Sequence, residues 1–345
     1  MIRELKAHGV RLAAALLAIG AVGIAFRDAD FSRAYELLAQ LGLAGIGLAL
    51  LPQLLGVLLE LSSWQRALDS IGYKTSFPAL FRVRVASESL SLCLPGGALL
   101  AESLKVPLFA RHSGFAAARA LVAIALRKYL LLAAQGMYFL LAAVASALSG
   151  SGGLRSALPL AAASTLLSAM AFGSRALFAG GRSAATCARW LSRLPIAALR
   201  TRITHAAAGI AAGDRDVAHF FTRGVANEAH SVLLALASWC CEALETFVLL
   251  SLLGARLDFA DVAAMEVALS LLRNLLVFLP AGIGVQDAGY AFFLNALGLP
   301  AANEMAVAFA LLKRSKELAW LTLGLALLGQ SRRAKGPQPT ASVAQ

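Results

Sequence analysis

The hydrophobic residues of this chain gather into long runs that are separated by short polar stretches. Six uninterrupted runs have 17 residues or more, and a helix of about that length crosses the roughly 30 Å hydrocarbon core of a bilayer. The six predicted spans are residues 10–26, 41–61, 120–148, 157–180, 225–253 and 304–329. The pattern therefore predicts an all-α fold, a polytopic transmembrane helical bundle.

Two further apolar segments, residues 83–110 and 262–298, are interrupted near their middles by proline and glycine. The motifs are Leu94-Pro95-Gly96-Gly97 and Leu279-Pro280-Ala281-Gly282-Ile283-Gly284. Proline removes a backbone donor and glycine weakens a helix, so both segments should break at their motifs. Broken backbone at membrane depth is tolerated only inside the protein or beside a water-filled cavity. We therefore expect both breaks to lie in the interior of the bundle.

The distribution of Lys and Arg decides how the interrupted segments are placed. If both cross the membrane, the chain has eight spans and the loop cations, with Arg84 counted among them, divide 12 to 12 between the two sides. If both are re-entrant hairpins, six spans remain and the division becomes 20 to 4 in favour of the cytoplasm. The positive-inside rule favours the second topology. We predict six spans, two re-entrant hairpins and cytoplasmic termini, with the signal-peptide-like start of the chain as an uncleaved first span.

The two interrupted segments also look like copies of each other. An acidic residue follows the motif proline by seven positions in both, Glu102 after Pro95 and Asp287 after Pro280. In the six-span topology the two hairpins enter from opposite sides, so the copies would be inverted, as in many secondary transporters. After the acidic residue each copy continues with a glycine and then a helix with two adjacent cations: Gly114 with Arg127-Lys128, and Gly298 with Lys313-Arg314.

The domain organisation follows from these repeats. We expect one integral membrane domain, residues 1–330, with repeats at about 41–148 and 225–329. A basic cytoplasmic linker, residues 181–223, lies between them, and residues 331–345 form a polar tail expected to be disordered. The linker is either a helix lying on the headgroups or a loop that only fixes orientation.

Composition agrees with a membrane protein and limits the other classes. Of the 345 residues, 59% are hydrophobic and 14% charged, and the mean hydropathy is +0.73. The net charge of +12 is explained by topology and by contact with anionic headgroups, so we expect no nucleic-acid partner. The four cysteines form no CxxC pair, and we expect no metal or other cofactor.

Ionisable residues within the apolar segments are the most informative feature. Each costs roughly 2.5–3.5 kcal/mol at the centre of a spanning helix, so such residues normally face an interior or a polar path. Together with Glu102 and Asp287 beside the breaks, they are Arg127, Lys128, Glu242, Glu245, Glu266, Arg273, Lys313, Arg314, Lys316 and Glu317. They form either a translocation or headgroup site, or buried ion pairs that only fix helix packing.

Spacing gives a first set of expected partners. Glu242 and Glu245 share one helical face, and so do Glu266 and Arg273. Lys313 and Glu317 are four residues apart and can pair, which would leave Arg314 and Lys316 for other partners. Broken helices also present free N–H groups, so with the neighbouring cations they suit a phosphate-bearing headgroup.

At these motifs the sequence resembles the flippase-like family that shares the transmembrane region of lysylphosphatidylglycerol synthases. The resemblance rests on the first motif with Glu102, on the run Phe278 to Tyr290, on Trp239 to Glu245 and on Met265-Glu266. The run Gly284-Val285-Gln286-Asp287-Ala288-Gly289-Tyr290 is most similar to the hopanoid-biosynthesis-associated branch. Ala281 and Asp287 stand where the family often has glycine and glutamate.

The resemblance implies a bacterial inner-membrane protein that moves or handles lipids or polyprenyl-linked lipids. The synthases carry a separate cytoplasmic catalytic domain, which we do not expect here, so the chain is not expected to be an enzyme. The leading hypothesis is a lipid translocator. The alternatives are a non-transporting scaffold or regulator of a lipid, hopanoid or glycolipid synthesis enzyme, which would act through the 181–223 linker, and an intramembrane enzyme using Glu242 and Glu245.

Overall fold

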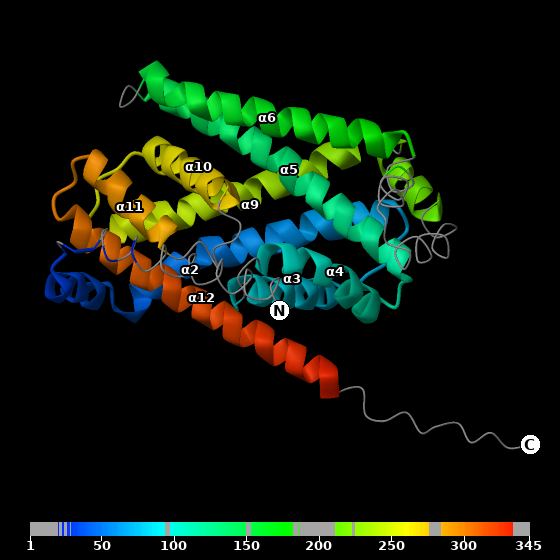
Figure 1. Ribbon diagram of the computed structural model, residues 1–345, viewed down its shortest axis with the longest axis horizontal. Helices are drawn as coiled ribbons and strands as arrows, with labels where there is room; N and C mark the ends of the chain where they lie inside the picture. Colours follow the sequence, from blue (N-terminus) through cyan, green and yellow to red (C-terminus); the bar gives the residue numbers. More distant parts are fainter. Residues whose placement is uncertain are drawn as a thin grey trace, which may run out of the picture.

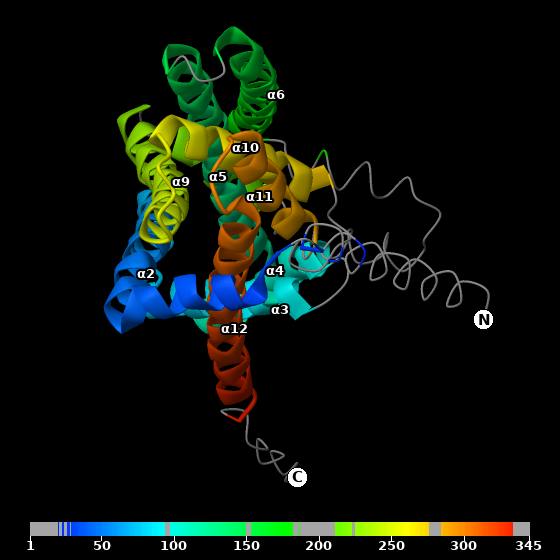
Figure 2. The same ribbon diagram turned by 90° about the vertical axis from the view of Figure 1, so that its left-hand side faces the viewer.

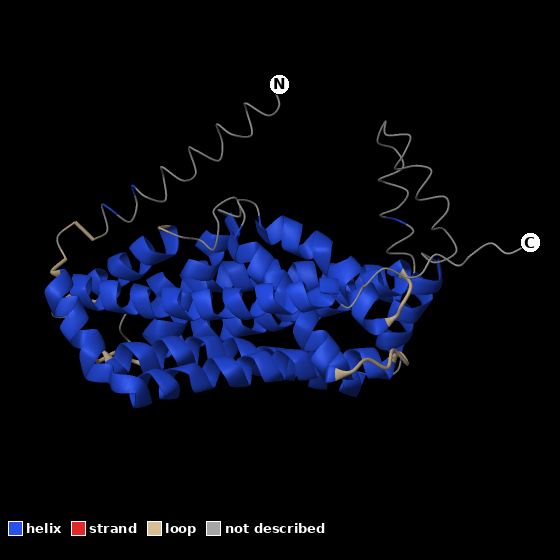
Figure 3. Cartoon of the chain, turned by 90° about the horizontal axis from the view of Figure 1, so that it is seen from below, coloured by secondary structure: helices blue, strands red, loops and turns tan. Residues whose placement is uncertain are grey.

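The computed structural model describes residues 29–93, 97–149, 153–181, 211–222, 225–275 and 284–333, with isolated positions at 20, 23, 26, 27 and 186. Every regular element within these ranges is an α-helix, and no strand is found among them (Figure 3). The predicted all-α fold is confirmed. Most of the first predicted span, most of the linker, and the motif residues Pro95, Gly96, Pro280 and Gly282 lie outside the described ranges.

Nine helices of the described ranges are labelled in chain order (Figure 1). They are α2 (Phe31–Ser70), α3 (Phe77–Cys93), α4 (Gly97–Ser113), α5 (Ala117–Leu148), α6 (Gly153–Ala179), α9 (Val225–Leu252), α10 (Phe259–Leu275), α11 (Val285–Ala296) and α12 (Ala302–Arg333). A further helix covers residues 211–222.

Four helices in the described ranges are long and apolar enough to cross a membrane. They are Ala44–Ser70, Ala117–Leu148, Ala157–Ala179 and Val225–Leu252, and they cover four of the six predicted spans. The sixth prediction, residues 304–329, falls within α12, which has 32 residues and includes the charged stretch around Lys313. The protein is thus a multi-pass helical membrane protein.

The second predicted span is longer than expected and begins at a break. Asp30 caps α2 by accepting hydrogen bonds from the backbone N–H groups of Ser32 and Arg33. Gly42 then has φ 60°, which ends the regular helix, and the apolar span starts at Ala44 and continues to Ser70 rather than to residue 61. The nine extra residues bring Trp64 inside the helix, and Glu60 then lies well before its end; both side chains are buried.

The two interrupted segments form pairs of short helices on either side of the motifs. The pairs are α3 with α4 and α10 with α11, and the two helices of each pair pack against each other. Their lengths of 17, 17, 17 and 12 residues correspond to about 18–25 Å, which is shorter than the bilayer core. In Figure 1 the two pairs lie towards opposite ends of the long axis. Short helices of this kind suit hairpins, although re-entry into the membrane remains a prediction.

Most of the packing divides between the two halves of the chain. One core cluster joins α2, α3, α4, α5 and the start of α9 around Trp64, Leu126 and Phe220. A second joins the end of α9 with α10, α11, α12 and the start of α2 around Tyr290 and Phe309. Figure 2 shows α12 running between the α10/α11 pair and the α3/α4 pair, and it contacts α3, α11 and α2. Because α12 touches both halves, its charged residues can reach partners on several helices.

The described end of the linker is a helix that packs against the first half. In helix 211–222 the side chains of Val217, Phe220 and Phe221 are buried in the first core cluster. Tyr73, in the turn after α2, donates a hydrogen bond to Asp216 on this helix. These residues therefore contribute apolar side chains to the core of the first half, and the position of the linker on the cytoplasmic headgroups stays a prediction.

Candidate functional site

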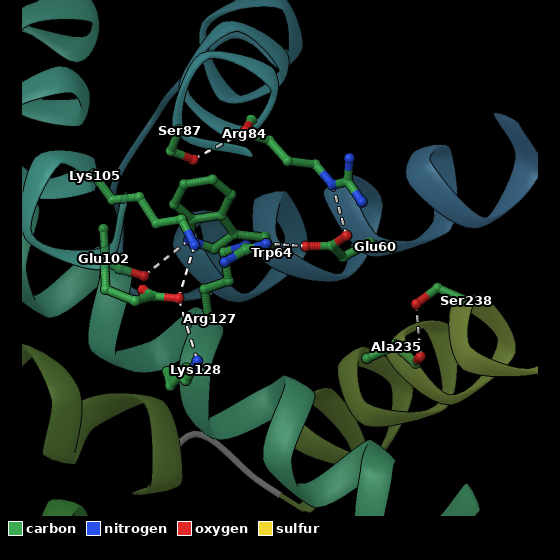
Figure 4. A network of polar contacts seen from close by, with 11 residues as sticks. Glu60, Trp64, Arg84, Ser87, Glu102, Lys105, Arg127, Lys128, Ala235 and Ser238 are labelled. Atoms are coloured by element: carbon green, nitrogen blue, oxygen red, sulfur yellow. Dashed lines mark hydrogen bonds and ion pairs between the residues drawn. The ribbon is translucent and has the colours of Figure 1, made fainter. Parts of the chain in front are cut away.

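Glu60 is the centre of a buried ion network in the first half (Figure 4). Its carboxylate accepts a hydrogen bond from Arg84 Nε on α3 at 2.7 Å and another from the Arg127 guanidinium on α5. The side chains of Glu60 and Arg127 are 9% and 7% exposed. Arg127 also lies over the ring of Trp64, 5.5 Å from its centroid, and its Nε has no hydrogen-bond partner. One carboxylate therefore serves two guanidinium groups.

Glu102 on α4 likewise binds two cations. Its Oε1 accepts from Lys105 Nζ at 2.8 Å and from Lys128 Nζ at 3.2 Å, so α4 is tied to α5 (Figure 4). Lys105 is buried, whereas the side chains of Glu102 and Lys128 are 35% and 65% exposed. One carboxylate again serves two cations, and this side of the network is open to its surroundings.

Glu266 on α10 is the buried centre of a second network, in the other half. Its Oε1 accepts hydrogen bonds from Thr246 Oγ1 at 2.5 Å, from the Tyr290 hydroxyl at 2.7 Å and from Lys313 Nζ at 3.2 Å. Lys313 also donates to the Tyr290 hydroxyl oxygen at 2.7 Å and lies over the rings of Tyr290 and Phe309. These contacts join α9, α10, α11 and α12 around one carboxylate.

Asp287 beside the second break forms a closed pair with α12. Both of its carboxylate oxygens accept from Arg314 Nη2, at 3.0 and 2.8 Å, and Oδ2 also accepts from the backbone N–H of Gly284 at 3.0 Å. Arg314 donates in addition to Glu317 at 2.5 Å. Asp287 therefore both caps the start of α11 and fixes α11 to α12.

The remaining predicted carboxylates bind cations on other helices. Glu245, which is buried on α9, accepts from Lys316 on α12. Glu242, one turn earlier, lies 3.8 Å from Arg273 on α10, and both of these side chains are more than a third exposed. The shared face of Glu242 and Glu245 thus holds two separate ion pairs.

All twelve ionisable residues singled out in the sequence take part in ion pairs, but one expected pairing was wrong. Lys313 does not pair with Glu317; it binds Glu266, and Glu317 binds Arg314 instead. Arg314 and Lys316 do bind partners on other helices, Asp287 on α11 and Glu245 on α9. Packing between helices overrides the spacing within α12, since buried carboxylates on α9, α10 and α11 lie within reach.

Several contributors could not be identified from the sequence. Arg84 was counted as a loop cation, yet it lies on α3 and binds Glu60. Glu60 sits near the end of a predicted span, where a charge is unremarkable, and Lys105 was not considered. A single carboxylate near the end of an apolar run gives little indication of a buried site. It becomes informative only once the helix is known to continue beyond it.

The two networks differ in their balance of charge. In the first, four cations form direct ion pairs with only two carboxylates, and Glu88 and Glu242 act on Arg84 from beyond ion-pair distance. In the second, four cations face five carboxylates: Arg273, Lys313, Arg314 and Lys316 against Glu242, Glu245, Glu266, Asp287 and Glu317. Buried charge that lacks a counter-ion is costly, so the first network is the one suited to an additional anion.

Other site chemistries have little support among the described residues. No cluster of three or more His, Cys, Asp or Glu that could hold a metal ion is found there. Cys240 and Cys241 are free thiols on α9 and form no disulfide. The described chemistry is thus one of ion pairs and hydrogen bonds at helix crossings.

Comparison with known proteins agrees with this architecture. No curated protein and no solved structure matches the chain. One family, described as "Lysylphosphatidylglycerol synthase TM region", matches residues 11–324, which is nearly the whole chain. The chain therefore belongs to the family of the lysylphosphatidylglycerol synthase transmembrane region.

Proposed function

We propose that the protein is a translocator of anionic membrane lipids and that it binds a phosphate-bearing headgroup at the first network, within its first half. Family membership places the chain among membrane proteins of lipid metabolism. The observation that carries the proposal is the first network, in which Glu60 and Glu102 each serve two cations. The cations there outnumber the carboxylates that pair with them, which suits the binding of an anion from outside the protein.

The chemistry of the network fits a phosphate group. Arginine presents a planar fork of donors that matches phosphate oxygens, and lysine acts as a point charge with three donors. Arg127 supplies a buried Nε with no partner, and Lys105 supplies further N–H groups from a buried position. Lys128 and Glu102 at the exposed edge would be the first groups to meet an entering headgroup. A lipid whose chains remain in the bilayer could thus present its phosphate to the network.

The second network would then have a structural role. Among the described residues, Arg273, Lys313 and Arg314 each bind a carboxylate that no other cation binds. We assign the anion to Arg84, Lys105, Arg127 and Lys128 instead. In this proposal the ion pairs of the second network hold α9 to α12 together while the headgroup occupies the first.

The proposal is tested by lipid movement in liposomes. The purified protein is reconstituted with a fluorescent phosphatidylglycerol, and the fraction accessible to a bleaching agent outside is followed with time. We expect faster inter-leaflet movement than in protein-free liposomes. Lys128→Gln should slow it about tenfold or more, since one charge-assisted hydrogen bond contributes about 1.5–3 kcal/mol and 1.4 kcal/mol is about a factor of ten.

Arg273→Gln is the matched control, because it removes one partly exposed cation from a single carboxylate in the second network. It should leave the rate within about twofold of wild type. Equal losses in both variants would contradict the assignment to the first network. If no phospholipid or polyprenyl phosphate in a panel moves faster than in protein-free liposomes, translocation is refuted. Loss of lipid synthesis in cells on replacing the linker arginines, with Lys128→Gln fully active, would then favour a regulator.

A further inference from the structure

A groove of about 390 Å³ lies between α2, α9 and α12, apart from the first network. Its volume is within the range of about 300–1,000 Å³ that is typical of ligand sites. Most of its surface is apolar. It is lined by Ile46, Ala49, Leu50, Gln53, Leu54, Glu245, Leu249, Leu312, Ser315, Lys316, Ala319, Trp320 and Leu323.

The polar groups that line the groove come from all three helices. Lys316 on α12 binds Glu245 on α9, and Gln53 is the polar lining residue on α2. The Gln53 Oε1 atom is buried and has no hydrogen-bond donor. A buried acceptor without a donor is destabilising, and an ammonium group has three N–H bonds to give. The lining of the groove therefore includes one acceptor in need of a donor and one cation.

The position of the groove indicates what adjoins it. Two of its walls, Ala44–Ser70 of α2 and α9, are helices long and apolar enough to span the membrane. Lining residues such as Ile46, Leu54 and Leu323 are exposed at the surface of the protein. In a bilayer such surfaces face lipid chains, so the molecule best placed to enter the groove is a lipid.

We infer that the groove binds the hydrocarbon chain of a hydroxyl-bearing lipid, with the hydroxyl placed between Gln53 and Lys316. A hydroxyl group can donate to Gln53 Oε1 and accept from Lys316 Nζ at the same time, which a plain hydrocarbon cannot do. The apolar side chains that line the rest of the groove pack against the hydrocarbon chain of the lipid. The groove shares no residue with the first network, so its occupancy does not depend on the translocation proposed above.

The test uses the full-length protein in lipid nanodiscs with a photoactivatable long-chain alcohol as the probe. After illumination, labelled peptides are identified by mass spectrometry. We expect residues 46–54 and 312–323 to be labelled several-fold more than the exposed face of α6. Gln53→Leu should reduce this labelling several-fold, because it removes the acceptor while keeping the apolar wall.

Two alanine variants separate a specific site from ordinary contact with lipid. Ala319 lines the groove and is exposed, so Ala319→Trp should fill the groove and abolish the labelling without disturbing the core. Ala169→Trp makes the same change on the exposed face of α6 and should leave it unchanged. Uniform labelling of all lipid-facing helices, or undiminished labelling in Ala319→Trp or Gln53→Leu, would overturn the inference. The labelling assay measures binding and not transport, so it can be interpreted even if the liposome assay shows no translocation.

Discussion

Removing the charge of Glu60 is the most direct perturbation of the first network. Glu60→Gln keeps the size of the side chain and one acceptor oxygen, but it leaves the guanidinium groups of Arg84 and Arg127 without a counter-ion. Both contacts cross between helices, from α2 to α3 and from α2 to α5. The substitution therefore tests whether the network stabilises the fold through charge.

The expected loss of stability follows from burial. The Glu60 and Arg84 side chains are only 9% and 18% exposed, so the value of about 0–1 kcal/mol for surface ion pairs does not apply. Removing one partner of a buried pair costs about 3–5 kcal/mol. Neutral hydrogen bonds between membrane helices average only about 0.6 kcal/mol. A loss of about 3 kcal/mol or more would thus identify charge, rather than hydrogen bonding, as the cause.

The assay is reversible unfolding in mixed micelles with increasing dodecyl sulfate, followed by tryptophan fluorescence. Trp64 lies against Arg127, so its emission reports on the network directly. A companion variant replaces Glu60, Arg84 and Arg127 together by methionine. Apolar replacement of a whole buried ion network is often neutral or stabilising, so this variant should recover most of the lost stability. It should nevertheless fail to move anionic lipid.

Two results would refute this reasoning. A loss below about 1 kcal/mol in Glu60→Gln would mean that the charges are solvated or that the network does not form. Lipid movement at the wild-type rate in the triple methionine variant would mean that the network only supports the fold. Stability and transport are measured separately, so each half of the argument can fail alone.

The remaining predictions concern packing and pH. A Cβ atom on Gly324 would lie 1.7 Å from Ser89 Oγ, so Gly324→Val should separate α12 from α3 and cost about 1–3 kcal/mol in the same unfolding assay. Gly329→Val is its control, because open space surrounds that position. Burial, and then the hydrogen bond to Asp216, raise the pKa of Tyr73. The stability they give is full below about pH 10 and falls as the pH rises through the raised pKa, and Tyr73→Phe should remove this alkaline loss in thermal unfolding.

The helices were the most predictable part of the molecule. Uninterrupted apolar length locates the spans at 120–148, 157–180 and 225–253 to within a few residues, because crossing a bilayer demands length and composition more than particular residues. Proline and glycine likewise indicate where α3 and α10 end. The end of the second span was placed at residue 61, because the polar and charged residues that follow, Arg66 among them, are typical of a loop. Only the packed structure shows that the helix continues to Ser70.

The choice of ion partners was not predictable in the same way. Positions within one helix suggested that Lys313 and Glu317 would pair, but a pair four residues apart on a helix contributes only about 0.2–0.5 kcal/mol. A buried carboxylate such as Glu266 gains far more from a cation, because burial without one is so costly. Partner choice therefore depends on which helices cross, and a single sequence does not contain that information.

The two halves can be compared through one ion pair in each. Glu102 binds Lys128 and Asp287 binds Arg314, at sequence separations of 26 and 27 residues. In both halves a glycine with positive φ lies between the two partners, Gly114 at 72° and Gly298 at 68°. These coincidences support the predicted repeat, because the same order of break, acid, glycine and cation recurs in each half, and the inversion of the two copies stays a prediction.

What distinguishes the copies is how fully each pair is enclosed. The side chain of Asp287 is 8% exposed and is fixed by the backbone of Gly284 and by Arg314, which Glu317 also holds. The side chain of Glu102 is 35% exposed and is shared between two lysines. Both pairs, Glu102 with Lys128 and Asp287 with Arg314, would hold the short helices in place. Only a pair whose charges are not fully balanced has charge left to bind a ligand. The difference between the halves therefore supports the proposal that the second network is structural and that the first binds an anion.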